Sequence, residues 1–337
     1  MQNNKIKIDQ DFLSLDETIR KIQNDEVLVI AADESFLSKL PTGNWIAGTI
    51  PYFMAKEGGV QTTEKAFVHS IIGNSKPKIS MYSSQTIDRI ANDSPDSGFT
   101  IVILPAGSKV HSAYAENAPI FEGMFDTPIV GWVSGFELNN AKSKKPKTMY
   151  GLGKHLSDEH AVALHVPIPQ EQVATISIIN TFSQGEGPTL TFPETGFNIG
   201  KCFVDGKEFE FTKFLKDFDI DTQLPMVADY NGTGVNVSIQ SIDESKNEAV
   251  LYAPIFKGVK YRFPDPRGSY EKMFKDAIIG HNDTDKSQFS VNCILNYLYS
   301  GLEGKKISEL VGPITFGEVA YQLLNQTAVY LTIEPSV

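Results

Sequence analysis

The chain has 337 residues, of which 41% are hydrophobic and 21% charged, and its formal net charge is −11. This balance is typical of a globular protein and excludes a largely disordered chain. The acidic composition also disfavours non-specific binding to nucleic acid or to an anionic membrane, because both need basic surface. We therefore expect no nucleic-acid partner.

Three features predict the compartment. No run of residues approaches the ~18 apolar positions of a membrane span, and the first residues lack the apolar core of a signal peptide. The two cysteines, Cys202 and Cys293, are too few for a disulfide framework in a chain of this length. We expect a cytoplasmic protein with no membrane insertion.

In chain order, apolar spacing predicts a helix over residues 11–24, with Ser14 and Glu17 as a capping box. Short continuous apolar runs predict buried strands at 27–32 and 99–104. Residues 289–299 fit either a buried strand or the start of a helix. Further strands are expected at 65–72, 127–133, 173–181, 234–242, 249–256 and 328–333, and helices at 34–40, 86–92, 212–218 and 270–278.

A faint internal repeat is also present. The run Gly48-Thr-Ile-Pro-Tyr aligns with Gly312-Pro-Ile-Thr-Phe, and the strand after each is similar, 66–71 against 328–333. We therefore predict a mixed α/β to α+β fold of two related, duplicated halves whose β-sheets are covered by helices. The halves are residues 1–150 and 151–337, with the boundary inside 142–185, where a lysine- and proline-containing stretch is the clearest linker.

The candidate reactive side chains do not form a standard catalytic or metal set. His155, His160 and His165 are five residues apart, whereas zinc sites on helices use spacings of three or four. Cys293 lies in an apolar run, which is more typical of an inert buried thiol than of a nucleophile. The cluster of Lys142, Lys144, Lys145 and Lys147 is interpreted as a solvated loop. We predict no metal, no cofactor and no catalytic residues.

Two polar features remain candidates for binding. Glu318 lies in an otherwise uncharged segment, and a buried carboxylate is costly unless it is paired. It either points to solvent at a turn, or bonds to neighbouring amides or to a ligand's amino group. The loop 229–234 can present backbone amides to an anion, although a turn into the following strand is the simpler interpretation.

The C-terminal motifs resemble a known family. The runs Phe289-Ser-Val-Asn-Cys-Ile-Leu-Asn296, Gly312-Pro-Ile-Thr-Phe-Gly-Glu-Val-Ala320 and Asn325-Gln-Thr327 are similar to the end of the FIST C-terminal domain. Ile46-Ala-Gly-Thr-Ile matches the start of the FIST N-terminal half more weakly. The run 43–54 also resembles a bacterial family signature, Gly-Asn-Trp-Ile-x-Gly-Thr-Ile-Pro-Tyr-Phe-Met.

The FIST resemblance implies an intracellular sensory module for a small ligand, non-catalytic, with a protein partner that carries the signal onward. Some members bind haem and respond to nitric oxide, so haem is an alternative cofactor, although no histidine here falls at a defensible ligand position. The family commonly has Arg at the position of Asn296, so the resemblance does not extend to recognition of an acidic ligand group there. The expected site lies between the halves and is lined by Gly48, Thr49, Tyr52, Asn231, Asn296, Thr315 and Glu318.

Two rival classes stay open on sequence alone. One is an enzyme that uses Cys293 or Glu318 in the cleft between the halves, which requires a histidine within hydrogen-bond reach. The other is a structural or assembly protein, whose mark is a large exposed apolar patch.

Overall fold

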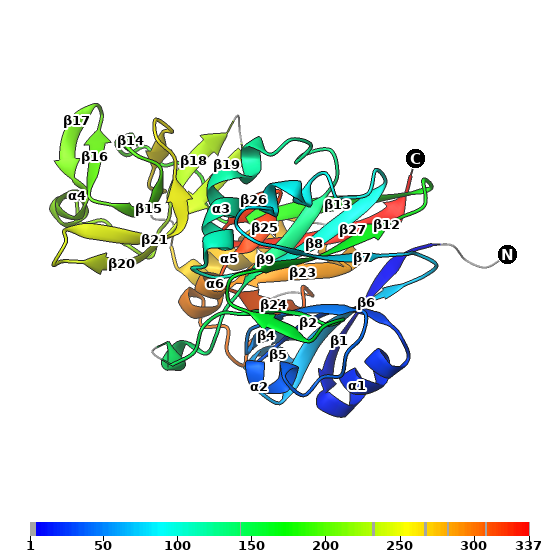
Figure 1. Ribbon diagram of the computed structural model, residues 1–337. Helices are drawn as coiled ribbons and strands as arrows, with labels where there is room; N and C mark the ends of the chain where they lie inside the picture. Colours follow the sequence, from blue (N-terminus) through cyan, green and yellow to red (C-terminus); the bar gives the residue numbers. More distant parts are fainter. Residues whose placement is uncertain are drawn as a thin grey trace.

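The computed structural model describes residues 5–141, 143–230, 233–265, 268–281, 283–306 and 309–336. Strands and helices in these residues form several mixed sheets (Figure 1), which confirms the predicted mixed α/β class. None of the described helices has the length and apolar character needed to cross a membrane.

The first sheet sets the pattern for the rest. Its order is β1-β6-β2-β3-β10-β11, in which β2 and β3 are parallel and the other neighbours are antiparallel. The bounds are β1 (Lys7–Ser14), β6 (Lys65–Ile72), β2 (Val27–Ala32), β3 (Trp45–Thr49), β10 (Thr148–Tyr150) and β11 (His155–Ser157).

The same order and the same parallel pair recur in two further sheets of the described chain. The second is β7-β12-β8-β9-β25-β26 and the third is β13-β27-β23-β24-β4-β5. The bounds are β7 (Lys78–Tyr82), β12 (Ala161–Pro167), β8 (Gly98–Pro105), β9 (Ile129–Ser134), β25 (Glu318–Ala320), β26 (Gln322–Leu324), β13 (Gln172–Asn180), β27 (Thr327–Pro335), β23 (Phe289–Cys293), β24 (Gly312–Thr315), β4 (Tyr52–Ala55) and β5 (Gly58–Gln61).

Each repeat passes its hairpin to another repeat. The hairpin β4–β5 follows β3 in sequence but pairs with β24, β10–β11 follows β9 but pairs with β3, and β25–β26 follows β24 but pairs with β9. The exchange is cyclic, so the three sheets are held together by backbone hydrogen bonds. We name the repeats unit 1 (7–72), unit 2 (78–167) and unit 3 (172–180 with 270–335).

This topology corrects the expected two-fold duplication, because the strand order repeats three times rather than twice. The predicted alignment found units 1 and 3 but placed them two residues out of register. Thr49 ends β3 opposite Ala32, and Thr315 ends β24 opposite Cys293, so Thr49 corresponds to Thr315. The sequence does not reveal unit 2, because a long loop, 135–147, separates its hairpin from β9. The change from unit 2 to unit 3 falls between Pro167, the end of β12, and Gln172, the start of β13.

Unit 3 carries an insertion, residues 181–269, at one end of the molecule (Figure 1). It has its own apolar core, centred on Phe192, Phe211 and Tyr261. Its sheets are ordered β17-β16-β14-β22-β18-β19 and β15-β21-β20. The bounds are β14 (Leu190–Thr191), β15 (Gly196–Ile199), β16 (Lys201–Val204), β17 (Lys207–Glu210), α4 (Phe211–Asp217), β18 (Met226–Tyr230), β19 (Thr233–Val237), β20 (Ile239–Asp243), β21 (Glu248–Ile255) and β22 (Tyr261–Arg262).

Helices lie between the strands of each unit. They are α1 (Leu15–Gln23), α2 (Glu34–Leu37), α3 (Lys109–Asn117), α5 (Tyr270–Ile279) and α6 (Ile294–Tyr299), with short 3₁₀ turns at Ile87–Ile90, Ala118–Ile120, Leu138–Asn140 and Thr284–Lys286.

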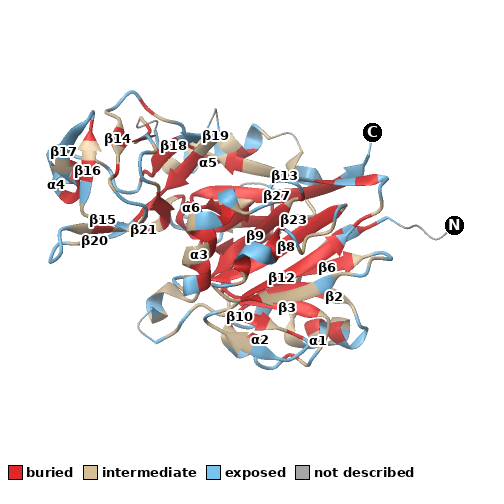
Figure 2. Ribbon diagram, turned by 45° about the horizontal axis from the view of Figure 1, so that its top comes forward, coloured by how far each residue is buried: buried red, intermediate tan, exposed pale blue. Residues whose placement is uncertain are grey.

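The largest core cluster lies between the three sheets, whose central strands are buried along most of their length (Figure 2). Trp132 on β9 is 1% exposed, and its ring packs against Gly48 of unit 1, which has no side chain. A Cβ on Gly48 would lie 2.5 Å from the Trp132 ring and 2.6 Å from Ile103. Gly48 is therefore required by close packing between units 1 and 2.

Most predicted elements are confirmed, with four differences. The capping box of Ser14 and Glu17 is present, but the expected helix 11–24 begins at Leu15 because residues 11–14 complete β1. The expected strand 234–242 is two strands, β19 and β20, in different sheets. Residues 289–299 are a strand and then a helix, β23 and α6. Helix α3 was not predicted.

Candidate functional site

A cavity lies at the carboxyl ends of β8 and β9. Ligands bind at this edge of parallel strands in many α/β proteins, because the loops and helix starts there are free of the sheet. The chain leaves β8 at Pro105, turns through Gly107 and enters α3, while β9 leads into Phe136. The cavity found here has a volume of about 410 Å³, which suits a small organic molecule.

Helix α3 begins with a complete cap. The Ser108 hydroxyl accepts a hydrogen bond from the His111 amide at 3.1 Å and donates to the Pro105 carbonyl at 2.7 Å. Gly107 adopts φ +69°, and no atom lies within 4 Å of the position that a Cβ would take. The cap therefore fixes the helix start while Gly107 leaves its backbone open.

His111 is a polar side chain of the cavity wall, and its imidazole ring is uncharged. It is 6% exposed, and burial lowers its pKa to about 4, so the ring is neutral at neutral pH. The Gly107 amide donates to His111 Nδ1 at 3.3 Å, which leaves the proton on Nε2. Within the described residues no acceptor for that Nε2–H is recorded.

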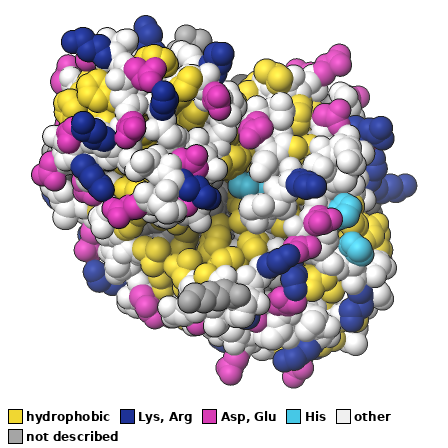
Figure 3. Space-filling model, turned by 60° about the vertical axis from the view of Figure 1, so that its left-hand side comes forward, with side chains coloured by type: hydrophobic (Ala, Val, Ile, Leu, Met, Phe, Trp, Pro, Cys, Tyr) yellow, Lys and Arg dark blue, Asp and Glu magenta, His cyan; other side chains and the backbone are white. Residues whose placement is uncertain are grey.

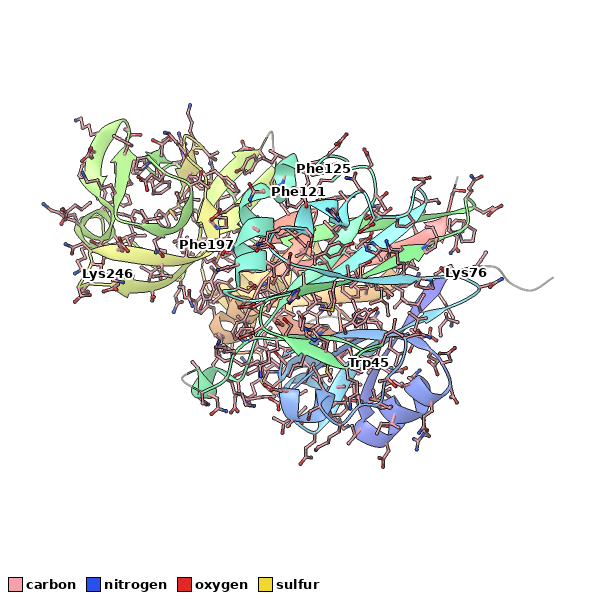
Figure 4. All side chains as sticks on the ribbon, in the orientation of Figure 1. Trp45, Lys76, Phe121, Phe125, Phe197 and Lys246 are labelled. Carbon is pink, nitrogen blue, oxygen red and sulfur yellow. The ribbon has the colours of Figure 1, made fainter. Side chains whose placement is uncertain are left out.

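Aromatic rings from four distant segments enclose the cavity. Phe136 and Phe316 meet edge to face with ring centroids 5.2 Å apart, and Phe197 lies 5.6 Å from the His111 ring. Tyr252 is the fourth ring, and burial raises its pKa to about 12. Figure 4 shows Phe197 on the side of the insertion that faces α3. The remaining wall residues are Ala106, Gly107, Ser112, Pro146, Gln240, Val250 and Leu251.

The cavity continues outward into a polar space of about 360 Å³. Ala106, Gly107 and Pro146 line both parts, so the two form one cleft with an apolar inner half and a charged outer half. The charged wall residues are Lys109, Lys145, Asp158 and Glu159. Figure 3 shows hydrophobic side chains gathered in a hollow on the face that carries the insertion.

The predicted site residues of unit 1 lie in the core rather than in this cleft. The Thr49 hydroxyl donates to the Gly135 carbonyl at 2.7 Å and accepts from the Lys147 amide at 2.9 Å. Tyr52 is 5% exposed, and its hydroxyl accepts from the Leu138 amide at 3.0 Å. With Gly48 packed on Trp132, these groups hold the loop 135–147 in place.

The predicted residues of unit 3 form a separate buried network. Asn296 accepts from the Tyr270 hydroxyl at 2.8 Å and donates to the Thr327 carbonyl at 3.0 Å. Thr315 donates to the Gly317 carbonyl at 3.0 Å. None of the six predicted residues within the described chain lines the cleft, and Asn231 lies outside the described residues.

Glu318 is fully buried, and burial raises its pKa to about 8. Its Oε2 accepts from the Thr327 hydroxyl at 2.7 Å and from the Thr327 amide at 3.3 Å, while Oε1 has no partner in the described structure. Cys293 lies beside it at 1% exposure, and burial raises the pKa of the thiol. An enclosed thiol with a raised pKa is a poor nucleophile, so the geometry gives no support to catalysis by Cys293.

The other polar clusters are structural. The lysines of the predicted linker form ion pairs, Lys144 with Asp33, Lys145 with Asp158 and Lys147 with Glu34, and Lys142 lies outside the described residues. His165 is buried and bonds to Tyr82 and Thr100. Among the residues that the structure describes, no group of three or more His, Cys, Asp or Glu side chains is placed to hold a metal ion.

The fold and the cleft define a three-repeat α/β protein with an inserted β domain and an aromatic cleft between the two. A family described as a family of unknown function (DUF6976) matches residues 13–334. The match spans all three repeats and the insertion, so the chain belongs to this family. No curated protein matches the chain. The FIST resemblance stays a prediction.

The cleft residues were absent from the predicted site. His111, Phe136, Phe197, Tyr252 and Phe316 come from separate parts of the chain, and no local motif joins them. One signal was available: Ser108 precedes Val110, Tyr114, Ala115 and Ala118, which are the spacings of a capped helix packed on one face.

Proposed function

We propose that this protein is a non-catalytic binding protein for a small organic molecule, which it holds in the cleft between α3 and the insertion. The single observation that carries the proposal is the cavity of about 410 Å³, walled by Phe136, Phe197, Tyr252 and Phe316. Specific small-molecule sites typically combine such apolar walls with a few oriented polar groups. Here the polar groups are His111, Ser112 and Gln240.

The partial exposure of those walls supports binding. Phe136, Phe197, Tyr252 and Phe316 are each half-buried, so the cleft presents to solvent an apolar surface that a bound ligand would cover. The two sides of the cleft come from different parts of the fold, the body on one side and the insertion on the other. A ligand that fills the space contacts both, so binding links the position of the insertion to occupancy.

The sensory role rests on a separate argument, the resemblance of the C-terminal motifs to the FIST family. On that basis we propose a cytoplasmic sensor whose signal passes to a separate protein partner. The insertion is the natural element to carry the signal, since it supplies Phe197, Gln240 and Tyr252 to the wall.

A matched pair of substitutions on α3 tests the binding proposal. Ser112 lines the cavity, whereas Asn117 is exposed at the other end of the same helix. We expect Ser112→Trp to fill the cavity and Asn117→Trp to leave it open. Native mass spectrometry of protein purified from its host should find a retained small molecule in the wild type and in Asn117→Trp, and much less in Ser112→Trp.

A thermal-shift screen of metabolites completes the test where the natural ligand is lost on purification. Stabilising compounds should act on the wild type and on Asn117→Trp but not on Ser112→Trp. The proposal fails if no compound stabilises the wild type and none is retained, or if Ser112→Trp responds as the wild type does.

A further inference from the structure

The polar groups of the cleft indicate the kind of chemical group that its ligand carries. We infer that its ligand is an organic anion, a molecule with a flat apolar body and a carboxylate or phosphate group placed at the start of α3. The inference rests on the proposed binding function and names the chemical class of the ligand.

The first observation is the free end of α3. The helix has nine residues, and its cap, Ser108, satisfies the amide of His111. The amides of Lys109 and Val110 have no recorded acceptor within the described chain, as expected for the first turn of a helix. Such amides, with the positive end of the helix dipole, form a ready site for an anion.

The second observation is independent of the helix end. His111 is more than nine-tenths buried, lines the cavity and holds its Nε2–H as a donor without a recorded acceptor in the described structure. That N–H is not sealed off from solvent, so it opens to the cavity, where a ligand oxygen can accept from it in place of water.

Access and charge agree with this placement. Gly107 has no side chain and open space around it, so a ligand can approach the backbone closely. No ion pair is recorded for Lys109 within the part of the chain that the structure describes, and the residue lines the outer half of the cleft. Its positive charge therefore adds to that of the helix start, where the amides of Lys109 and Val110 lie.

The acidic residues of the outer half define where the anion cannot be. Asp158 pairs with Lys145 at 3.0 Å, and Glu159 is exposed at the same rim. An anionic group near Glu159 is repelled, so the favourable position is the junction of the two halves beside Gly107. The apolar body then lies inward, against Phe197 and Phe316.

Unit 1 contains the same arrangement with the anion supplied by the protein. The cap of α2 is Asp33, whose carboxylate accepts from the Ser35 amide at 2.9 Å and pairs with Lys144 at 2.7 Å. In unit 2 the cap is the neutral Ser108, and Lys109 stands nearby. The ligand's anionic group then takes the place at the start of α3 that the Asp33 carboxylate occupies at the start of α2.

Two fluorescent probes with the same aromatic body separate the anion from the apolar contribution. 1-Anilinonaphthalene-8-sulfonate carries a negative charge, and N-phenyl-1-naphthylamine lacks it. Isothermal titration calorimetry should give an affinity for the sulfonate at least ten-fold higher than for the neutral probe. Raising the salt concentration should narrow that ratio, because exposed charge is screened.

Substitutions locate the difference. Ser112→Trp should abolish binding of both probes, while Asn117→Trp should abolish neither. Lys109→Gln changes an exposed side chain and should lower the sulfonate affinity about three-fold. His111→Phe should lower it about ten-fold. Neither should weaken the neutral probe.

The outcomes distinguish the two proposals. If neither probe binds, or if Ser112→Trp binds both as the wild type does, the proposed binding function fails and this inference with it. If both probes bind equally tightly in the wild type and Ser112→Trp loses both, the binding function stands and the anion is ruled out. An unstable His111→Phe leaves Lys109→Gln to decide, since an unchanged affinity ratio in that variant also overturns the inference.

Discussion

The carboxyl ends of β2 and β3 and those of β8 and β9 are corresponding places in two repeats, yet one is closed and the other is open. In unit 1 the loop 135–147 covers the strand ends, held by Thr49 through the Gly135 carbonyl and the Lys147 amide. In unit 2 the same loop contributes Phe136 and Pro146 as walls and leaves the space between them empty.

The charges at the three strand ends follow the same division. Asp33 occupies the helix start in unit 1. In unit 3 Glu318 lies against Cys293 and Thr315, the last residues of β23 and β24. Unit 2 has Ser108 at this place. Repetition of the strand order alone therefore does not make a site. The long loop and the insertion leave one of three similar strand ends open, and the helix cap at that end has no carboxyl group of its own, so the end can accept an anionic ligand.

The largest expected effect concerns the packing that all three ends share. Trp132 fills the space over Gly48 and pairs across the strand with Glu318. Replacing it with alanine should lower the free energy of unfolding by about 3–5 kcal/mol, since the cavity left behind cannot collapse around a glycine. Urea denaturation measures this loss. Phe136→Ala, at the open end, is the matched control and should cost much less, and equal losses would contradict the division into closed and open ends.

The next effect is specific to the closed end of unit 3 and depends on pH. Burial raises the pKa of Glu318 to about 8 from an ordinary value of 4.5, so the folded state keeps a proton that the unfolded state releases. Stability is therefore lost as the pH rises from about 4.5 to about 8, by ~1.4 kcal/mol per unit at most.

Glu318→Gln is neutral at every pH and should remove that loss. Compared with the wild type, the variant should gain stability as the pH rises through this window, and the difference should level off above it. Chemical denaturation at pH 5, 6.5 and 8 measures the trend. A difference that does not change with pH would mean that Glu318 titrates normally.

Local patterns predicted the strands of this fold better than its assembly. Continuous apolar runs found β2 and β8, because strands buried on both faces are apolar throughout. The cyclic hairpin exchange could not be predicted from the sequence, since pairing between β4 and β24 depends on residues far apart in the chain. The burial of Glu318 against the Thr327 amide was one of the two alternatives that its neighbours suggested.

The cleft was lost for a different reason. Its walls, Phe136, Phe197, Tyr252 and Phe316, are ordinary aromatic residues in the sequence, and a lone aromatic residue is more often part of a core. They become a site only when the insertion folds back over α3. The helix itself was within reach of the sequence, through Ser108 and the apolar positions that follow it.

A smaller effect tests the closed end of unit 1. Burial alone would raise the pKa of Asp33, but hydrogen bonds from Lys144 and Ser35 outweigh it and the pKa is lowered. Lys144→Gln leaves the buried carboxylate without its charge partner and should cost about 1–3 kcal/mol at neutral pH. The cost should fall as the pH drops through the lowered pKa of Asp33, because the protonated acid needs no cation.

Lys145→Gln is the control for that substitution, in the same loop. Lys145 pairs with Asp158 on the exposed rim, and such surface pairs contribute little to stability. Its denaturation midpoint should match that of the wild type. If the two lysine variants lose equal stability, the closed end is not held by the pair of Lys144 and Asp33.

The smallest expected change in stability comes from making the open end resemble the closed one. Ser and Asp are nearly equal as helix caps, but an Asp carboxylate cannot donate to the Pro105 carbonyl as the Ser108 hydroxyl does, so Ser108→Asp should lower the free energy of unfolding by about 1 kcal/mol. The new carboxylate would stand at the start of α3, where the structure leaves room for a ligand's anionic group. Calorimetry should therefore show about a ten-fold loss of affinity for the sulfonate probe and no loss for its neutral counterpart.

Ser108→Asn is the control, because asparagine caps a helix without adding charge. This variant should keep the wild-type preference for the sulfonate probe, since the difference between the open and closed ends is then the carboxylate alone. Retained sulfonate binding in Ser108→Asp would show that the anion lies elsewhere in the cleft.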